Sequence, residues 1–146
     1  MKKDLKANIA TVLLLEPADL VRTDTASGLL DTADCNGVEI DVIIGALTGV
    51  DSTNYLTPVL QECDTTENDD FTAVDVADML GAFSKVDAAT KDSVIQRVGY
   101  IGGKRYVRVN LDYTGNGITA GIVGVVGILG YSKEAPMTAP AAVAAT

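Results

Sequence analysis

The sequence predicts an all-β fold, a β-sandwich or jelly-roll-like barrel of seven to eight strands with extended N- and C-terminal arms. Val, Ile and Thr are frequent, and the 14 glycines fall between short apolar runs. Several runs alternate apolar and polar side chains, which is typical of half-buried strands. We divide the 146 residues into an arm over 1–8, a sandwich over 9–132 and a flexible Ala/Pro-rich tail over 133–146.

The first predicted strand is the apolar run from Ile9 to Leu15, which we expect to end at Pro17. The lysines before it resemble the start of a signal peptide. Because Asp4 interrupts them and no clear cleavage motif follows, we interpret the run as a strand. A turn at Asn36-Gly37 leads into Val38–Ile44, where apolar and acidic side chains alternate.

The next predicted strand, Tyr55 to Cys63, contains Pro58, which places it at a sheet edge or at a bulge because proline has no N–H for the ladder. The acidic run 64–70 and the return over 71–74 predict a hairpin. Its carboxylates are candidate calcium ligands, but they lack the spacing and the glycine of an EF-hand, so a solvated tip is the simpler interpretation. A helical turn capped by Asp75 or Asp78 follows, through Met79 and Leu80.

The C-terminal half predicts three strands, over 93–101, 105–113 and 118–129. Gly102-Gly103 joins the first two as a hairpin, because glycine adopts the positive φ of tight turns. Both faces of the last strand are apolar, so one face fits the core and the other is covered by the same chain or by another subunit. We assign to a subunit interface the face that carries Val123, Val125, Leu129 and Tyr131.

Composition excludes several classes of function. The net charge of −9 favours solubility and opposes binding to nucleic acid or to an anionic membrane, and no apolar run reaches the roughly 18 residues of a membrane span. The chain has no His, the commonest general base and metal ligand, so we expect neither enzymatic activity nor a cofactor. Cys35 and Cys63 lack any zinc spacing. Two small buried or half-buried thiols in a reducing cell are the simpler interpretation, and a disulfide between them stays open.

Basic residues gather on the predicted 93–113 hairpin of this acidic chain. One interpretation is an ordinary polar outer face, and the other is a docking patch for an acidic protein surface. Gly102-Gly103-Lys104 lacks the spacing of a phosphate-binding loop. The candidate partner-contact residues are Arg97, Lys104, Arg105 and Arg108.

Three stretches resemble a known family: 60–64 leading to 71–74, then 98–109, and then 124–130. The pattern is similar to small structural proteins of tailed bacteriophages and prophages that are described as head decoration, cement or auxiliary capsid proteins. The resemblance covers roughly the last two-thirds of the chain, and its most specific part is the segment 100–106. The family's first hairpin usually has an Asp-Asp-Gly turn, whereas here 64–70 is longer and has no glycine.

The resemblance implies a virion protein on the outer capsid surface. Such a protein binds the major capsid protein, stabilises contacts between capsomers and forms a homo-oligomer, commonly a trimer. It has no catalytic residue and no cofactor. Two alternatives are a tail or neck component and a carbohydrate- or cell-surface-binding module, although the chain has no Trp to serve as a sugar platform.

Overall fold

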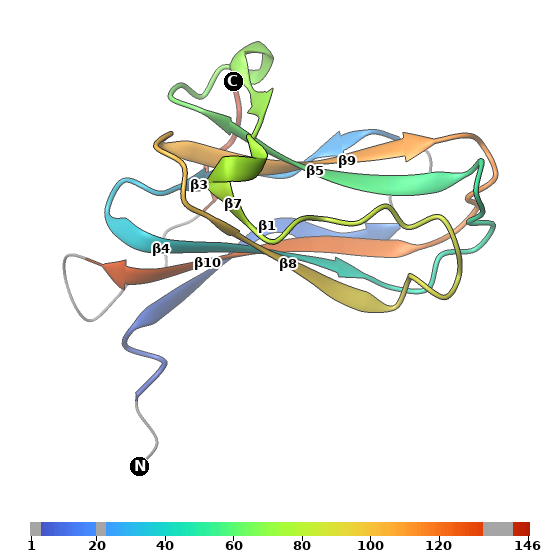
Figure 1. Ribbon diagram of the computed structural model, residues 1–146, viewed down its shortest axis with the longest axis horizontal. Helices are drawn as coiled ribbons and strands as arrows, with labels where there is room; N and C mark the ends of the chain where they lie inside the picture. Colours follow the sequence, from blue (N-terminus) through green and yellow to red (C-terminus); the bar gives the residue numbers. More distant parts are fainter. Residues whose placement is uncertain (1–3, 20–22, 133–141) are drawn as a thin grey trace.

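The computed structural model describes residues 4–19, 23–132 and 142–146, which form two antiparallel sheets packed face to face (Figure 1). Sheet A contains, in spatial order, β1 (Ile9–Asp19), β10 (Ile122–Ser132), β4 (Cys35–Ile44), β8 (Val94–Tyr100) and β7 (Met79–Leu80). Sheet B contains β2 (Thr25–Ala26), β9 (Tyr106–Thr114), β5 (Tyr55–Cys63) and β6 (Thr72–Ala73), and β3 (Leu30–Asp31) also pairs with β9. The all-β prediction is confirmed, and the two separate sheets have the arrangement of a β-sandwich.

The core lies between the sheets and follows from the alternation along the central strands. On β4, Ile40, Val42 and Ile44 point inward, and on β9 the inward residues are Val107, Val109 and Leu111. All six are buried, because successive side chains of a strand point to opposite faces. The alternation predicted for 38–44 is therefore the observed one, and β9 alternates in the same way.

Two strand ends differ from the prediction. β1 does not end at Pro17 but continues to Asp19, with register shifts between Leu13 and Leu15 and between Leu15 and Ala18. β1 is an edge strand, where a proline removes no ladder hydrogen bond that the sheet needs. Asn36-Gly37 is not a turn, because β4 already begins at Cys35.

The predicted hairpin of β8 and β9 is wrong. β8 belongs to sheet A and β9 to sheet B, so residues 101–105 cross from one layer to the other (Figure 1). Neither Gly102 nor Gly103 has a positive φ. At Gly102 a Cβ would lie 2.6 Å from the Tyr100 ring, so the glycine serves close packing and not turn geometry.

The short elements carry the weakest signal in the sequence. Of the ten strands in the described residues, six have 7–11 residues and four have only two, which are too short to alternate visibly. The hairpin of β5 and β6 forms as predicted, with Gln61 opposite Ala73, and its acidic tip contains the turn η1 (Asn68–Asp70). The turn η2 (Val76–Asp78) is capped by Asp75, but the residues after it form β7 and not a helical turn.

The end of the chain lies on the sandwich. Val143 exchanges two backbone hydrogen bonds with Leu29, at 2.8 and 3.0 Å, and the Thr146 amide donates to the Thr66 carbonyl at 2.9 Å. Residues 142–146 are thus docked, which differs from the flexible tail that was predicted, and the remainder of that tail, 133–141, lies outside the described residues. At the other end, residues 4–8 lead away from β1 (Figure 1).

Cys35 and Cys63 form no disulfide. None of the helical segments in the described residues is long and apolar enough to cross a membrane.

Candidate binding surface

The outer face of sheet A is formed by the residues that alternate with the core positions. On β10, Val123, Val125 and Leu129 are buried in the chain's own core. The predicted subunit interface is therefore wrong for these three residues, and of its four members only Tyr131 is exposed. The opposite side of β10 points to solvent and carries Ile122, Val126 and Ile128. The sequence predicted two apolar faces correctly but assigned the wrong one to the interior.

Apolar side chains continue across this face from strand to strand. Leu13 on β1 lies opposite Val126, and Ile43 on β4 lies opposite Ile95 on β8. Leu13, Ile95 and Ile122 are 52%, 56% and 57% exposed, although side chains of this size are usually buried. We call this set the apolar face: Leu13, Ile43, Ile95, Ile122, Val126 and Ile128.

One charged cluster interrupts the apolar face on β4 and β8. The Arg97 guanidinium donates to Glu39 Oε1 through Nε at 2.9 Å and through a terminal nitrogen at 2.5 Å, and its Nε lies 3.6 Å from Asp41 Oδ1. Asp41 Oδ1 is buried and accepts no hydrogen bond. Burial raises the pKa of Asp41, the Glu39 carboxylate raises it further, and Arg97 partly opposes both. Arg97 therefore pairs with both carboxylates of this cluster.

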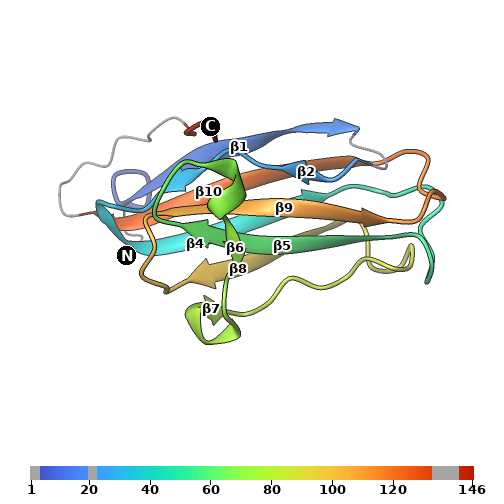
Figure 2. The same cartoon turned by 90° about the horizontal axis from the view of Figure 1, so that it is seen from above.

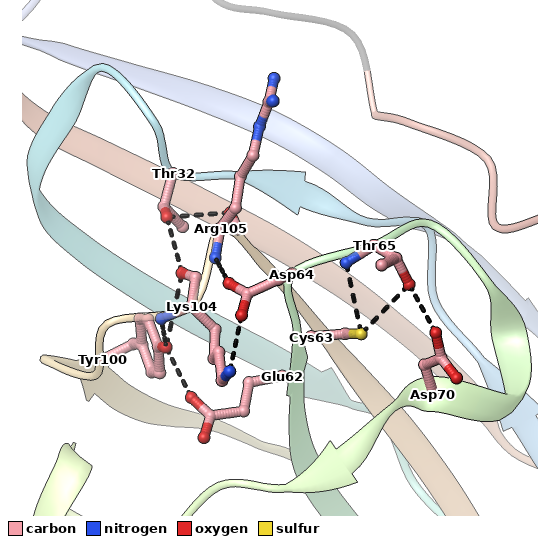
Figure 3. A network of polar contacts seen from close by, with 9 residues as sticks. All are labelled: Thr32, Glu62, Cys63, Asp64, Thr65, Asp70, Tyr100, Lys104 and Arg105. Atoms are coloured by element: carbon pink, nitrogen blue, oxygen red, sulfur yellow. Dashed lines mark hydrogen bonds and ion pairs between the residues drawn. The ribbon is translucent and has the colours of Figure 1, made fainter.

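The other predicted contact residues are held by partners within the chain. Lys104 Nζ bonds Asp64 Oδ2 at 2.6 Å, and the Arg105 amide also donates to Asp64, at 3.4 Å (Figure 3). The Arg105 side chain points away from that network and pairs with Asp31 at 2.8 Å. The Lys104 ammonium lowers the pKa of Asp64, and Arg105 lowers that of Asp31.

Tyr100 anchors the same network from the core side. Its hydroxyl donates to Glu62 Oε2 at 2.5 Å and accepts from the Lys104 amide at 2.8 Å (Figure 3). Burial and the Glu62 carboxylate raise the pKa of Tyr100. The Thr32 hydroxyl also joins the network, by donating to the Arg105 carbonyl at 2.9 Å. The contacts join β5, β8 and the crossing residues 101–105, so this end of the sandwich is fixed by its own polar groups.

Arg108 lies inside and not on a partner-facing patch. Only 6% of it is exposed, its guanidinium lies 4.1 Å from the centre of the Phe71 ring, and Nε donates to Gln61 Oε1 at 2.8 Å. A terminal nitrogen bonds the Asn68 side chain. Burial lowers the pKa of Arg108. The guanidinium therefore organises the acidic loop from within.

The four basic residues do not form one surface. Arg97 lies on the outer face of sheet A, Lys104 and Arg105 lie at the crossing between the sheets, and Arg108 supports the loop over sheet B. The predicted clustering assumed a hairpin that does not form.

The acidic loop 64–70 is held by hydrogen bonds within the protein. Thr65 Oγ1 donates to Asp70 Oδ2 at 2.9 Å, and Cys63 Sγ lies 3.4 Å from both the amide and the hydroxyl of Thr65 (Figure 3). The Asn68 amide donates to the Thr146 carbonyl at 2.9 Å. Among the residues that the structure describes, no group of His, Cys, Asp or Glu is arranged to hold a metal ion.

Sequence reasoning thus identified the strand that carries the exposed surface and one of its charged residues, Arg97. It missed Leu13, Ile43 and Ile95, although alternation places each on the side opposite the core. No protein-family model matches the chain, and no curated protein does.

Proposed function

We propose that this chain is a structural protein of a tailed-phage virion, which binds the major capsid protein on the outer capsid surface and stabilises contacts between capsomers. The apolar face carries the proposal. Exposed apolar area of this kind is typical of surfaces that bind other proteins, because covering it releases water from several large side chains at once. The resemblance of three stretches to phage decoration proteins is the reason for proposing the major capsid protein as the partner.

The form of the molecule suits a protein that adds cohesion between neighbours. Ion pairs and hydrogen bonds fix the end of the sandwich at 101–105, so little conformational entropy would be lost when that end meets a partner (Figure 3). The net charge of −9 would keep the molecule on the outside of the shell, since packaged DNA repels it. We further propose a homo-oligomer, for which the resemblance implies a trimer, and an N-terminal arm that reaches a neighbouring subunit.

The carbohydrate-binding alternative has less support. Sugars stack on exposed aromatic rings, and Tyr100 is buried while Lys85 lies 4.4 Å over the Tyr55 ring. Of the five tyrosines, all described, Tyr131 is the one with a largely exposed side chain. A tail or neck position agrees with the same surface and differs only in the number of copies.

The test is to purify virions that carry this gene and to measure this protein against the major capsid protein by quantitative mass spectrometry. A simple ratio to the capsid subunits, with the protein located on the shell by electron microscopy, is the expected result. A small number of copies at one vertex would move the protein to the neck or tail. Absence from the particle would overturn the proposal.

A further inference from the structure

We propose that the outer edge of β8 binds an extended acidic segment of another protein, which adds to sheet A as a further strand. The site is the cleft between β8 and residues 82–85. Its ligand bonds backbone groups at the edge of the sheet and does not cover the outer face. The inference therefore goes beyond the proposed function, because it concerns a second binding site for a ligand of different chemistry.

β8 has a strand on its outer side over only part of its length. β7 pairs with the last two residues of β8 and ends at Leu80. Gly81 has a φ of +90°, and the chain then leaves the edge of sheet A, since its next bridge, at Val86, is to β5 of sheet B (Figure 2). In the described part of the chain, residues 94–98 of β8 therefore have β4 on one side and no strand on the other.

The backbone groups that face this open edge follow from the ladder. In an antiparallel pair, the N–H and C=O groups of successive residues point alternately to the two sides. The Ile101 amide donates to the Asp78 carbonyl at 2.9 Å, toward β7, so the groups of Arg97 and Ile95 point to the same side. Each residue offers one donor and one acceptor there. Another extended backbone matches both kinds of group, whereas a phosphate backbone has no donor for the two carbonyls.

A side-chain bridge holds the neighbouring segment away from this edge. The Ser84 amide donates to Gln96 Oε1 at 2.7 Å, and Gln96 Nε2 donates to the Ser84 carbonyl at 3.0 Å. The Gln96 amide thus occupies the position at which a strand beside residue 84 would bond. Because Gln96 points to the same side of β8 as the buried Val98, the bridge lies on the inner side. The cleft beside it is open to the outside and has a volume of about 460 Å³.

The lining of the cleft is basic, although the chain is acidic. Among the residues that the structure describes, Lys85, Lys91 and Arg97 line it and no carboxylate does. Their side chains are 45%, 55% and 64% exposed. Arg97 is paired with acids on β4, but the two lysines share the single carboxylate of Asp87, at 3.2 and 2.6 Å, and so keep a net positive charge. Acidic side chains are attracted here, whereas the net charge of −9 repels them elsewhere.

The opposite edge of sheet A is protected against strand addition. β1 contains Pro17 and two register shifts against β10, which interrupt the regular spacing of its edge groups. All seven residues of β8 pair with β4 without a shift, so the outer edge of β8 is regular. A regular edge beside a basic cleft is the arrangement by which sheets bind extended peptides.

The experiment uses the purified full chain and a short synthetic peptide of alternating threonine and glutamate, capped at both ends. Binding, followed by NMR up to millimolar peptide, should slow hydrogen exchange of the Ile95 and Arg97 amides by about tenfold or more. Two further peptides carry N-methyl groups on every threonine or on every glutamate. One of them loses the donors that face β8 and should bind about tenfold more weakly, while the other should bind as the parent does.

Variants of the chain separate backbone pairing from charge. Ile95→Pro removes an open N–H and should weaken binding by about tenfold, whereas Ile95→Ala keeps that N–H and should not. Lys91→Glu should weaken binding by about threefold or more, and Lys6→Glu, at an exposed lysine before β1, is the matched control.

Three results would overturn the inference: unchanged exchange at Ile95 and Arg97, equal binding of the two N-methylated peptides, or equal binding by the Lys91→Glu and Lys6→Glu variants. The comparison of the N-methylated peptides uses the unaltered chain, so it holds even if Ile95→Pro does not fold. Absence of the protein from virions would end the proposed function but would not change peptide binding.

Discussion

The outer face of sheet B is polar and is covered by the chain itself, whereas the outer face of sheet A is apolar and open. On sheet B, β9 points Arg108, Asn110 and Asp112 outward, and the loop 64–71 and residues 142–146 lie over one end (Figure 2). On sheet A the corresponding positions of β10 are Ile122, Val126 and Ile128. The two layers share one core, so the difference between their outer faces does not arise from the needs of folding.

The comparison indicates which surface is available to a partner. Polar groups on sheet B already have donors and acceptors in the same chain, and exchanging these for contacts with a partner would gain little free energy. Covering the exposed apolar groups of sheet A removes their area from water, which contributes favourably to binding. Contacts with other proteins are therefore expected to concentrate on sheet A.

The largest expected effect is a difference in stability between substitutions on the inner and the outer side of β10. Val125→Asp places a carboxylate in the core and should lower the free energy of unfolding by about 4 kcal/mol or more. Val126→Asp, one residue later on the apolar face, should change it by no more than about 1 kcal/mol. Urea unfolding followed by circular dichroism measures both. Equal losses would mean that the outer face is part of the folding core.

The second effect is a loss of stability when the loop 64–71, which lies over sheet B, loses its contact with Arg108. Arg108→Ala removes the donor of Gln61 and Asn68 and uncovers the Phe71 ring, so it should cost about 1–3 kcal/mol in urea unfolding. Arg105→Ala removes an exposed ion pair with Asp31 and serves as the control, with no measurable loss expected. If Arg108→Ala were as mild as the control, the loop would not depend on the buried guanidinium.

The sequence predicted the strands that alternate clearly, because alternation is a local property. It showed that both faces of β10 are apolar but not which face is buried, since that depends on where the other sheet packs. The packing at Gly127 is an example. A Cβ there would lie 2.8 Å from a Leu30 methyl carbon, so the absence of a side chain at Gly127 leaves space for Leu30 of β3 in the core. That contact joins residues far apart in the chain and leaves no periodic signal.

The hairpin error has a similar cause. Gly102-Gly103 between two apolar runs has the composition of a tight turn, yet β8 and β9 enter different sheets. The path of the chain between the two sheets depends on two carboxylates. Glu62 accepts a hydrogen bond from the Tyr100 hydroxyl, and Asp64 accepts one from Lys104. These partners lie on or just after β5, and the sequence gives no measure of their proximity. The predicted basic patch depended on that hairpin and was lost with it.

A smaller effect is expected from removing residues 142–146. This deletion uncovers the cluster of Leu29, Cys63 and Phe71 and removes the backbone bonds to Leu29, so it should cost about 1–2 kcal/mol. In a Cys35→Ser background, the rate at which an aromatic disulfide reagent modifies Cys63 should rise by about tenfold. An unchanged rate would show that the loop alone protects the thiol and that the end of the chain adds no cover to sheet B.

The smallest effect is a difference in the pH response of two carboxylates, Asp41 on β4 of sheet A and Asp64 just after β5 of sheet B. Burial and Glu39 raise the pKa of Asp41 above 3.8, so the folded state binds its proton more tightly than the unfolded chain, and the stability contribution falls as pH rises through that window. Asp41→Asn should remove this slope.

Asp64 should respond with the opposite sign. Lys104 lowers the pKa of Asp64 below 3.8, so its contribution is present above that pH and is lost as pH falls through the lower value. In a plot of the free energy of unfolding against pH, Asp64→Asn should therefore flatten the slope below pH 3.8. Asp41→Asn should flatten the slope above pH 3.8. Free energies of unfolding from urea titrations, at pH values on both sides of 3.8, measure the slopes of the two variants. Slopes of the same sign would mean that burial and Glu39 do not dominate the environment of Asp41, and that Arg97 satisfies this carboxylate within the chain.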